Sequence, residues 1–100
     1  MATYAELAVI ASDASFGAFQ SKVRVACAVK AQALLTAATP TPAGIAWALT
    51  TLRSPATAAE PVLWYVIAAN SGATIAQILG ATDAAVQANV NTAVDAIVST

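Results

Sequence analysis

Residues that start and stop helices recur along this chain, and they constrain its fold more than any other feature of the sequence. Thr3 and Glu6 match a capping box, in which each side chain accepts a hydrogen bond from a free backbone N–H group at a helix start. Further threonine caps are expected at Thr41, Thr74 and Thr82. Together these signals predict six helices, over residues 4–11, 15–37, 42–52, 58–69, 75–79 and 83–98.

The start of the fourth helix carries two signals that must be reconciled. Thr57 and Glu60 have the spacing of a capping box, and Pro61 is compatible with a helix only within its first turn. We therefore predict that regular helix begins at residue 58. Glu60 is then expected to stabilise a helix start through its charge, as are Asp13 and Asp83.

Apolar side chains recur at helical spacing, most clearly at Val86, Val90 and Ile97 in the last segment. No segment combines sustained apolar–polar alternation with β-branched enrichment, so no sheet is expected. Alanine supplies 28 of the 100 residues, and its small side chain lets helices pack closely. The sequence predicts an all-α protein with a single domain over residues 1–100, a compact bundle of about six helices, two long and the rest short.

Charged residues make up only 9% of the chain, against roughly 25% in an average soluble domain. So few charges favour a protein whose outside is partly covered, either by copies of itself in a homo-oligomer or by other proteins. The candidate contact residues are three cations among valines on the 15–37 helix and two adjacent aromatic residues: Lys22, Arg24, Lys30, Trp64 and Tyr65. The cations favour an acidic protein surface, although solvated cations and core packing of the aromatics also explain these residues.

The side chains that most catalytic and metal sites require are scarce in this sequence. Histidine is absent, and no two of the five carboxylates stand three or four residues apart on one predicted helix. Cys27 is the single cysteine, and its apolar neighbours predict a buried residue that acts as a small hydrophobic side chain. We therefore expect no enzyme activity, no cofactor and no metal.

Residues 74–86 have the spacing of a helix-turn-helix, with a glycine in the turn. The second helix is expected to expose Asp83, Gln87 and Asn91, where DNA-reading proteins also offer cations. No cation follows Arg53, and the net charge of the chain is −1. We therefore expect the geometry of the motif without nucleic-acid binding.

Two long uncharged stretches raise the question of a membrane span, which needs roughly 20 predominantly apolar residues. The stretch over 31–52 is interrupted by the Thr-Pro-Thr-Pro sequence at 39–42, and the stretch over 61–82 by Asn-Ser-Gly at 70–72. Each is better explained as a helix, a turn and a second helix. No membrane segment is expected.

Short segments spread over most of the chain carry a resemblance to known proteins: residues 2–7 (ATYAEL), 23–26 (VRVA), 46–48 (AWA), 68–70 (AAN), 73–78 (ATIAQI), 81–87 (ATDAAVQ) and 89–90 (NV). They resemble small, alanine-rich helical virion proteins of tailed bacteriophages. The resemblance implies a structural protein, made in the bacterial host cytoplasm and built into the virion. Its place would be as a capsid cement or decoration protein or a head–tail or tail component, in contact with itself or with capsid, portal or tail proteins. It transfers no catalytic residues.

Two other functions remain open at this point. The uncharged stretches are also compatible with a small phage protein that acts on the membrane during lysis. The segment over 74–86 is compatible with a helix-turn-helix DNA-binding protein. Both alternatives are less favoured than a structural protein of the virion.

Overall fold

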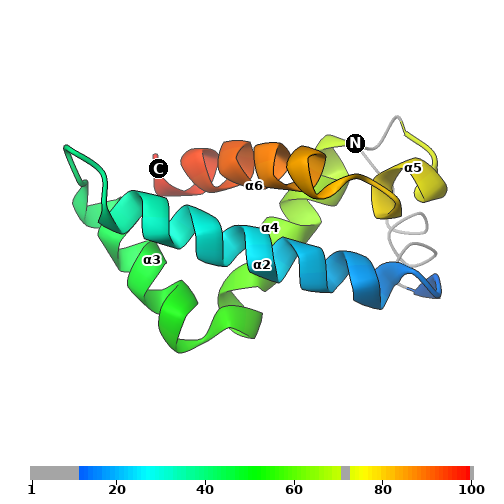
Figure 1. Ribbon diagram of the computed structural model, residues 1–100, viewed down its shortest axis with the longest axis horizontal. Coiled ribbons are helices and arrows are strands. Elements are labelled where there is room, and N and C mark those ends of the chain that lie inside the picture. Colours follow the sequence, from blue (N-terminus) through cyan, green and yellow to red (C-terminus); the bar gives the residue numbers. More distant parts are fainter. Residues whose placement is uncertain (1–11, 71–72, 100) are drawn as a thin grey trace.

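The structure is a computed structural model that describes residues 12–70 and 73–99, and these residues form helices joined by short turns (Figure 1). The helices are α2 (Phe16–Leu35), α3 (Pro42–Arg53), α4 (Pro55–Ala69), α5 (Ile75–Leu79) and α6 (Asp83–Val98). The described part of the chain contains no strand, so the all-α prediction is confirmed there. The predicted helix over residues 4–11 lies outside the described residues.

The predicted threonine caps are present at the starts of three helices. Thr41 and Thr82 each accept a hydrogen bond through Oγ1 from the backbone N–H group three residues later, at 3.1 and 3.2 Å. Thr74 does the same at 3.2 Å, and Gln77 Oε1 accepts in return from the Thr74 N–H group at 3.0 Å. Because each cap joins residues only three positions apart, the sequence alone is sufficient to place these helix starts.

The start of α4 differs from the prediction. The helix begins at Pro55, and Pro61 lies inside it rather than in its first turn. Pro55 takes the first helical position, where a proline loses no helical hydrogen bond. Pro61 leaves the Thr57 carbonyl without its usual bond from the residue four positions on, and burial of the apolar side of α4 offsets that loss. Glu60 is therefore an interior helical residue, and its predicted place at a helix start is wrong.

Helices α2 and α6 lie side by side and run in the same direction, with α4 crossing behind them and α3 packed against α2 (Figure 1). Polar contacts between α2 and α6 advance together along both helices. They run from Lys22, which contacts the start of α6, to Lys30, which contacts Asp95 near its end. The parallel arrangement matters for the candidate site because it brings Lys22 and Lys30 of α2 to Asp83 and Asp95 of α6, so these charges are paired within the chain.

The core lies where α2, α4 and α6 meet. Its largest fully buried side chains come from all three helices: Phe19, Val23, Val62, Leu63, Val66, Ile67, Val86, Val90 and Val94. Small buried residues fill other positions between helices: Ala26, Cys27, Ala31, Ala48, Ala59 and Ala93. Alanine therefore occupies many of the buried positions between the helices. The radius of gyration of 13.4 Å is close to the value of about 13 Å for a compact chain of this length.

Two helical glycines are expected to respond differently to replacement by alanine. Around Gly17, in the first turn of α2, nothing lies within 4 Å of an added methyl group. Gly17→Ala should therefore raise the free energy of unfolding by about 0.5–1 kcal/mol, because alanine is the better helix former. At Gly44 the methyl group would lie 2.9 Å from Thr41 Oγ1 and displace the cap of α3. Gly44→Ala should show no gain and a loss of up to about 1 kcal/mol.

Urea unfolding of both variants beside the parent chain measures these two changes in the free energy of unfolding. Each variant serves as the control for the other, since the chemical change is the same. Equal stabilisation by both would show that the Thr41 cap does not restrict the side chain at position 44.

Candidate protein-binding surface

Two of the four cations hold α2 to α6. Lys22 Nζ donates a hydrogen bond to the Ala81 carbonyl at 3.0 Å and lies 3.7 Å from Asp83 Oδ1. Lys30 Nζ lies 2.8 Å from Asp95 Oδ1, and only 15% of the Lys30 side chain is exposed. Lys22 and Lys30 are both predicted contact residues, and the structure places their ammonium groups in contacts within the chain.

A third polar contact joins the same two helices between the ion pairs. Gln87 Nε2 on α6 donates to the Ala26 carbonyl on α2 at 3.1 Å and to Asn91 Oδ1 at 2.9 Å. The segment over 74–86 does form two capped helices joined by a turn, as expected. Gln87 and Asn91, however, are half-buried rather than presented to solvent. The expected DNA-facing side of the second helix is therefore partly used for packing against α2.

The two candidate aromatic residues have different environments. Trp64 is half-buried, with its ring centroid 5.8 Å from that of Phe16. Its indole Nε1 donates to Glu60 Oε1 at 3.0 Å. Tyr65, the next residue on α4, is 45% exposed. Trp64 is thus engaged mainly within the chain, whereas Tyr65 remains accessible.

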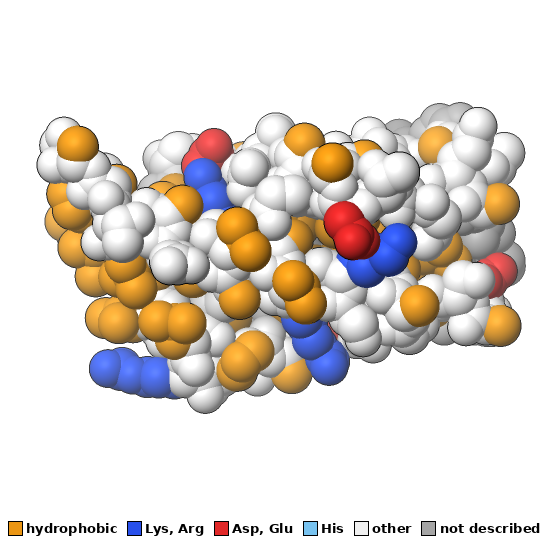
Figure 2. Space-filling model, in the orientation of Figure 1, with side chains coloured by type: hydrophobic (Ala, Val, Ile, Leu, Met, Phe, Trp, Pro, Cys, Tyr) orange, Lys and Arg blue, Asp and Glu red, His pale blue; other side chains and the backbone are white. Residues whose placement is uncertain are grey.

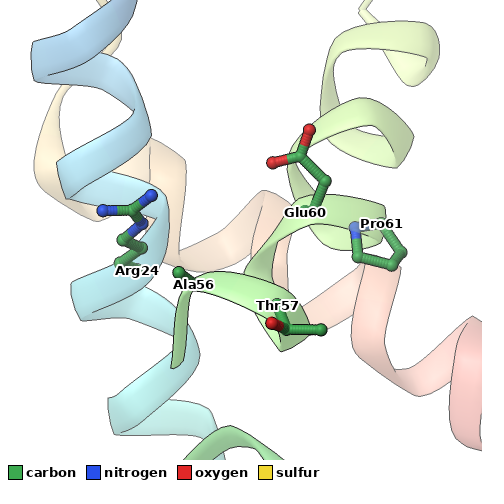
Figure 3. Close-up of a pocket in the computed structure, with 5 residues that line it drawn as sticks. All are labelled: Arg24, Ala56, Thr57, Glu60 and Pro61. Atoms are coloured by element: carbon green, nitrogen blue, oxygen red, sulfur yellow. The ribbon is translucent and has the colours of Figure 1, made fainter. Parts of the chain in front are cut away.

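The two arginines differ from the lysines because neither forms an ion pair with any described residue. Arg24 is exposed on α2 and lines an open surface depression with a volume of about 510 Å³ (Figure 3). The other residues that line this depression belong to α4: Ala56, Thr57, Glu60 and Pro61. Glu60 stands across this depression from Arg24. Arg53 is the exposed last residue of α3. Both guanidinium groups are available to a partner.

Large apolar side chains are exposed on the helices that carry these arginines. Val25 and Val29, one turn apart on α2, are 65% and 50% exposed. Leu49 and Leu52 on α3 are 37% and 55% exposed. Figure 2 shows hydrophobic side chains gathered over α2 and α3, with cationic side chains along the lower edge of the same face. We name this surface the α2–α3 face, and it comprises Arg24, Val25, Val29, Leu49, Leu52 and Arg53.

Sequence reasoning identifies part of the α2–α3 face and misses the rest. Arg24 is a predicted contact residue, and the valines beside it are the signal that α2 is apolar on more than one side. Leu49 and Leu52 are absent from the predicted contact set. The signal that could have found them is the number of large apolar residues on α3, which is more than one buried side of a short helix accommodates.

The one cysteine of the sequence, Cys27, lies among the described residues. Cys27 is fully buried, as predicted, and burial raises the pKa of its thiol from 9.0 to about 11. The thiol therefore stays protonated at neutral pH and is a poor nucleophile. Within residues 12–70 and 73–99, no three side chains of histidine, cysteine, aspartate or glutamate come together in a way that could hold a metal ion.

None of the described helices is both long enough and apolar enough to cross a membrane. The chain matches no protein-family model, no curated protein and no solved structure.

Proposed function

We propose that this chain is a structural protein of a tailed-bacteriophage virion and that it binds neighbouring proteins of the particle through its α2–α3 face. Its place would be as a capsid cement or decoration protein or a head–tail or tail component. The resemblance of its short segments to alanine-rich virion proteins supports the class of protein. The observation that carries the mode of action is the exposure of Val25, Val29, Leu49 and Leu52 on two adjacent helices.

Burial of these side chains supplies the driving force for binding. Full burial of a valine or leucine side chain contributes about 1.5–3 kcal/mol, so covering the exposed parts of Val25, Val29, Leu49 and Leu52 contributes on the order of 4 kcal/mol. The four residues stand on helices that are already held by the core. Little conformational freedom of the backbone is therefore lost on binding, and more of the burial energy remains as affinity.

The proposal is tested by quantitative mass spectrometry of phage particles purified from the organism that encodes the chain. We expect the chain in the particles at a fixed copy number. A double variant, Val25→Asp with Leu52→Asp, places two charges on the α2–α3 face and should reduce incorporation at least tenfold, which corresponds to about 1.4 kcal/mol of binding free energy.

The matched control is Thr50→Asp, which places the same side chain at another exposed position of α3, outside the α2–α3 face. This control should be incorporated like the parent chain, and circular dichroism should show equal helix content in all three proteins. Absence of the chain from the particles overturns the proposed function. Equal incorporation of the double variant and the control overturns the role of the α2–α3 face.

A further inference from the structure

The four cations of the chain fall into two chemically distinct pairs. Lys22 and Lys30 pair with Asp83 and Asp95 across the contact between α2 and α6. Arg24 and Arg53 have no such partner among the described residues, and both belong to the α2–α3 face. Among the described residues, both cations without an ion pair therefore lie on the surface that exposes Val25, Val29, Leu49 and Leu52.

We propose that the α2–α3 face binds an acidic amphipathic helix of another protein, whose carboxylates pair with Arg24 and Arg53 while its apolar ridge covers the exposed valines and leucines. This inference rests on the proposed function and names the partner chemistry of the same surface. A guanidinium group presents its N–H groups in a planar fork that matches both oxygens of a carboxylate. Acidic side chains at the edge of the partner's ridge therefore complement this face.

The positions of the two arginines fit such a partner. Arg24 directly precedes Val25 on α2, and Arg53 directly follows Leu52 on α3. Each cation thus belongs to the same turn of helix as an exposed apolar residue, and Figure 2 shows cationic side chains along the lower edge of the hydrophobic side chains on α2 and α3. An apolar centre with polar residues at its rim is the usual organisation of a protein–protein interface.

A second copy of the chain is a poor occupant of the same face. The six residues of the α2–α3 face include two arginines and no carboxylate, and the carboxylates beside it are Glu60, across a depression from Arg24, and Asp83, which is paired with Lys22. A symmetric dimer through this face would therefore bring four guanidinium groups together with few carboxylates to offset their charge. Each described carboxylate also has a contact within the chain: Asp83 and Asp95 pair with the lysines, Glu60 accepts a hydrogen bond from Trp64 Nε1, and Asp13 accepts one from the Ser15 N–H group. Charge complementarity therefore favours a different, acidic protein.

Nucleic acid and anionic lipid are less suitable partners. Binding to phosphates depends on several clustered cations, whereas this face offers only two. Its centre is formed by four aliphatic side chains, which gain nothing from contact with the phosphate backbone of a nucleic acid. Sequences that bind anionic lipid typically carry about four to eight clustered cations, more than this face has. A protein helix with an apolar ridge and flanking carboxylates contacts both the aliphatic side chains and the two arginines.

The inference is tested with two synthetic amphipathic helical peptides of about 20 residues, long enough for helix formation. Both carry the same leucine ridge, flanked by glutamates in one peptide and by lysines in the other. Binding to the full chain is measured by fluorescence anisotropy at low salt. We expect the glutamate peptide to bind at least tenfold more tightly than the lysine peptide.

Substitutions of the arginines then assign this preference to the α2–α3 face. Arg24→Glu with Arg53→Glu should reverse the preference, whereas Arg24→Lys with Arg53→Lys should keep its direction. The matched control is Ala88→Glu with Thr92→Glu, which adds two negative charges at exposed positions of α6, outside the α2–α3 face. The control should still prefer the glutamate peptide.

Three results would overturn the inference: equal binding of both peptides, binding to phosphatidylglycerol vesicles but to neither peptide, or a dimer in sedimentation equilibrium that Leu52→Asp dissociates. These outcomes are separable from those for the proposed function. If Val25→Asp with Leu52→Asp abolishes incorporation into particles but the peptides bind equally, the structural role stands and the acidic partner is wrong. If the charge preference holds but particles lack the chain, only the proposed function fails.

Discussion

Replacing Phe19 by alanine is expected to lower the free energy of unfolding by about 3–5 kcal/mol. Phe19 is 1% exposed and lies in the core cluster to which α2, α4 and α6 all contribute. Removal of its ring loses the transfer free energy of a large apolar group, and the well-packed helices around it cannot fully close the cavity. Because small domains are stable by only about 5–15 kcal/mol, the variant should unfold at a much lower urea concentration.

The matched control for Phe19→Ala is Val25→Ala on the same helix. Val25 is 65% exposed, so its truncation should change the free energy of unfolding by less than about 0.5 kcal/mol. Both variants are measured by urea unfolding with circular dichroism as the probe. A loss below about 1 kcal/mol for Phe19→Ala would show that α2 does not pack on the core as described.

Replacing Ala48 by leucine is expected to lower the free energy of unfolding by about 1–3 kcal/mol, although leucine is the more hydrophobic residue. Ala48 is 0% exposed on α3, a helix that packs against both α2 and α4. A leucine there needs space that the neighbouring helices already fill. The expected loss therefore comes from overpacking, which forces the helices apart or strains side chains.

Ala46→Leu is the control, because it makes the same substitution two residues earlier on the same helix. Ala46 is exposed, so the added atoms meet solvent, and the expected change is within about 0.5 kcal/mol. Thermal and urea unfolding of the two variants provide the comparison. If Ala48→Leu were as stable as Ala46→Leu, alanine at position 48 would not be required for close approach of the helices.

These two predictions separate the residues that stabilise the fold from those proposed to bind a partner. Phe19 and Ala48 are buried, and changes there alter the free energy of unfolding. Val25 and Leu52 are more than half exposed and contribute less to folding. Substitutions on the α2–α3 face can therefore be read as effects on binding, because they leave the core intact.

Most of the fold could be predicted from the sequence because its boundaries depend on local interactions. The caps at Thr41, Thr74 and Thr82 join atoms of residues only three positions apart, and the predicted helix starts follow from them. The prediction was wrong at the start of α4. Pro61 was expected to lie in the first turn, so the helix was predicted to begin at residue 58 instead of Pro55. The free energy of burying that helix against the core is a tertiary term, and it offsets the missing hydrogen bond at Pro61.

The candidate site was less predictable, because three similar cations on one helix have different fates. In the sequence, Lys22, Arg24 and Lys30 are equivalent candidates for contact with another protein. The structure shows that the two lysines face α6 and its aspartates, whereas Arg24 is exposed beside Val25. Leu52 and Arg53 belong to a different helix, and nothing local relates them to α2.

The sequence by itself determined an all-α fold, the starts of α3, α5 and α6, and a low content of charged residues. Only the tertiary structure decided which charges remain free and which apolar side chains share a face. The physical reason is distance along the chain. Lys22 reaches its carbonyl partner across 59 residues, and Gln87 reaches the Ala26 carbonyl across 61. Such contacts depend on the parallel packing of α2 and α6, which the periodicity of neither helix encodes.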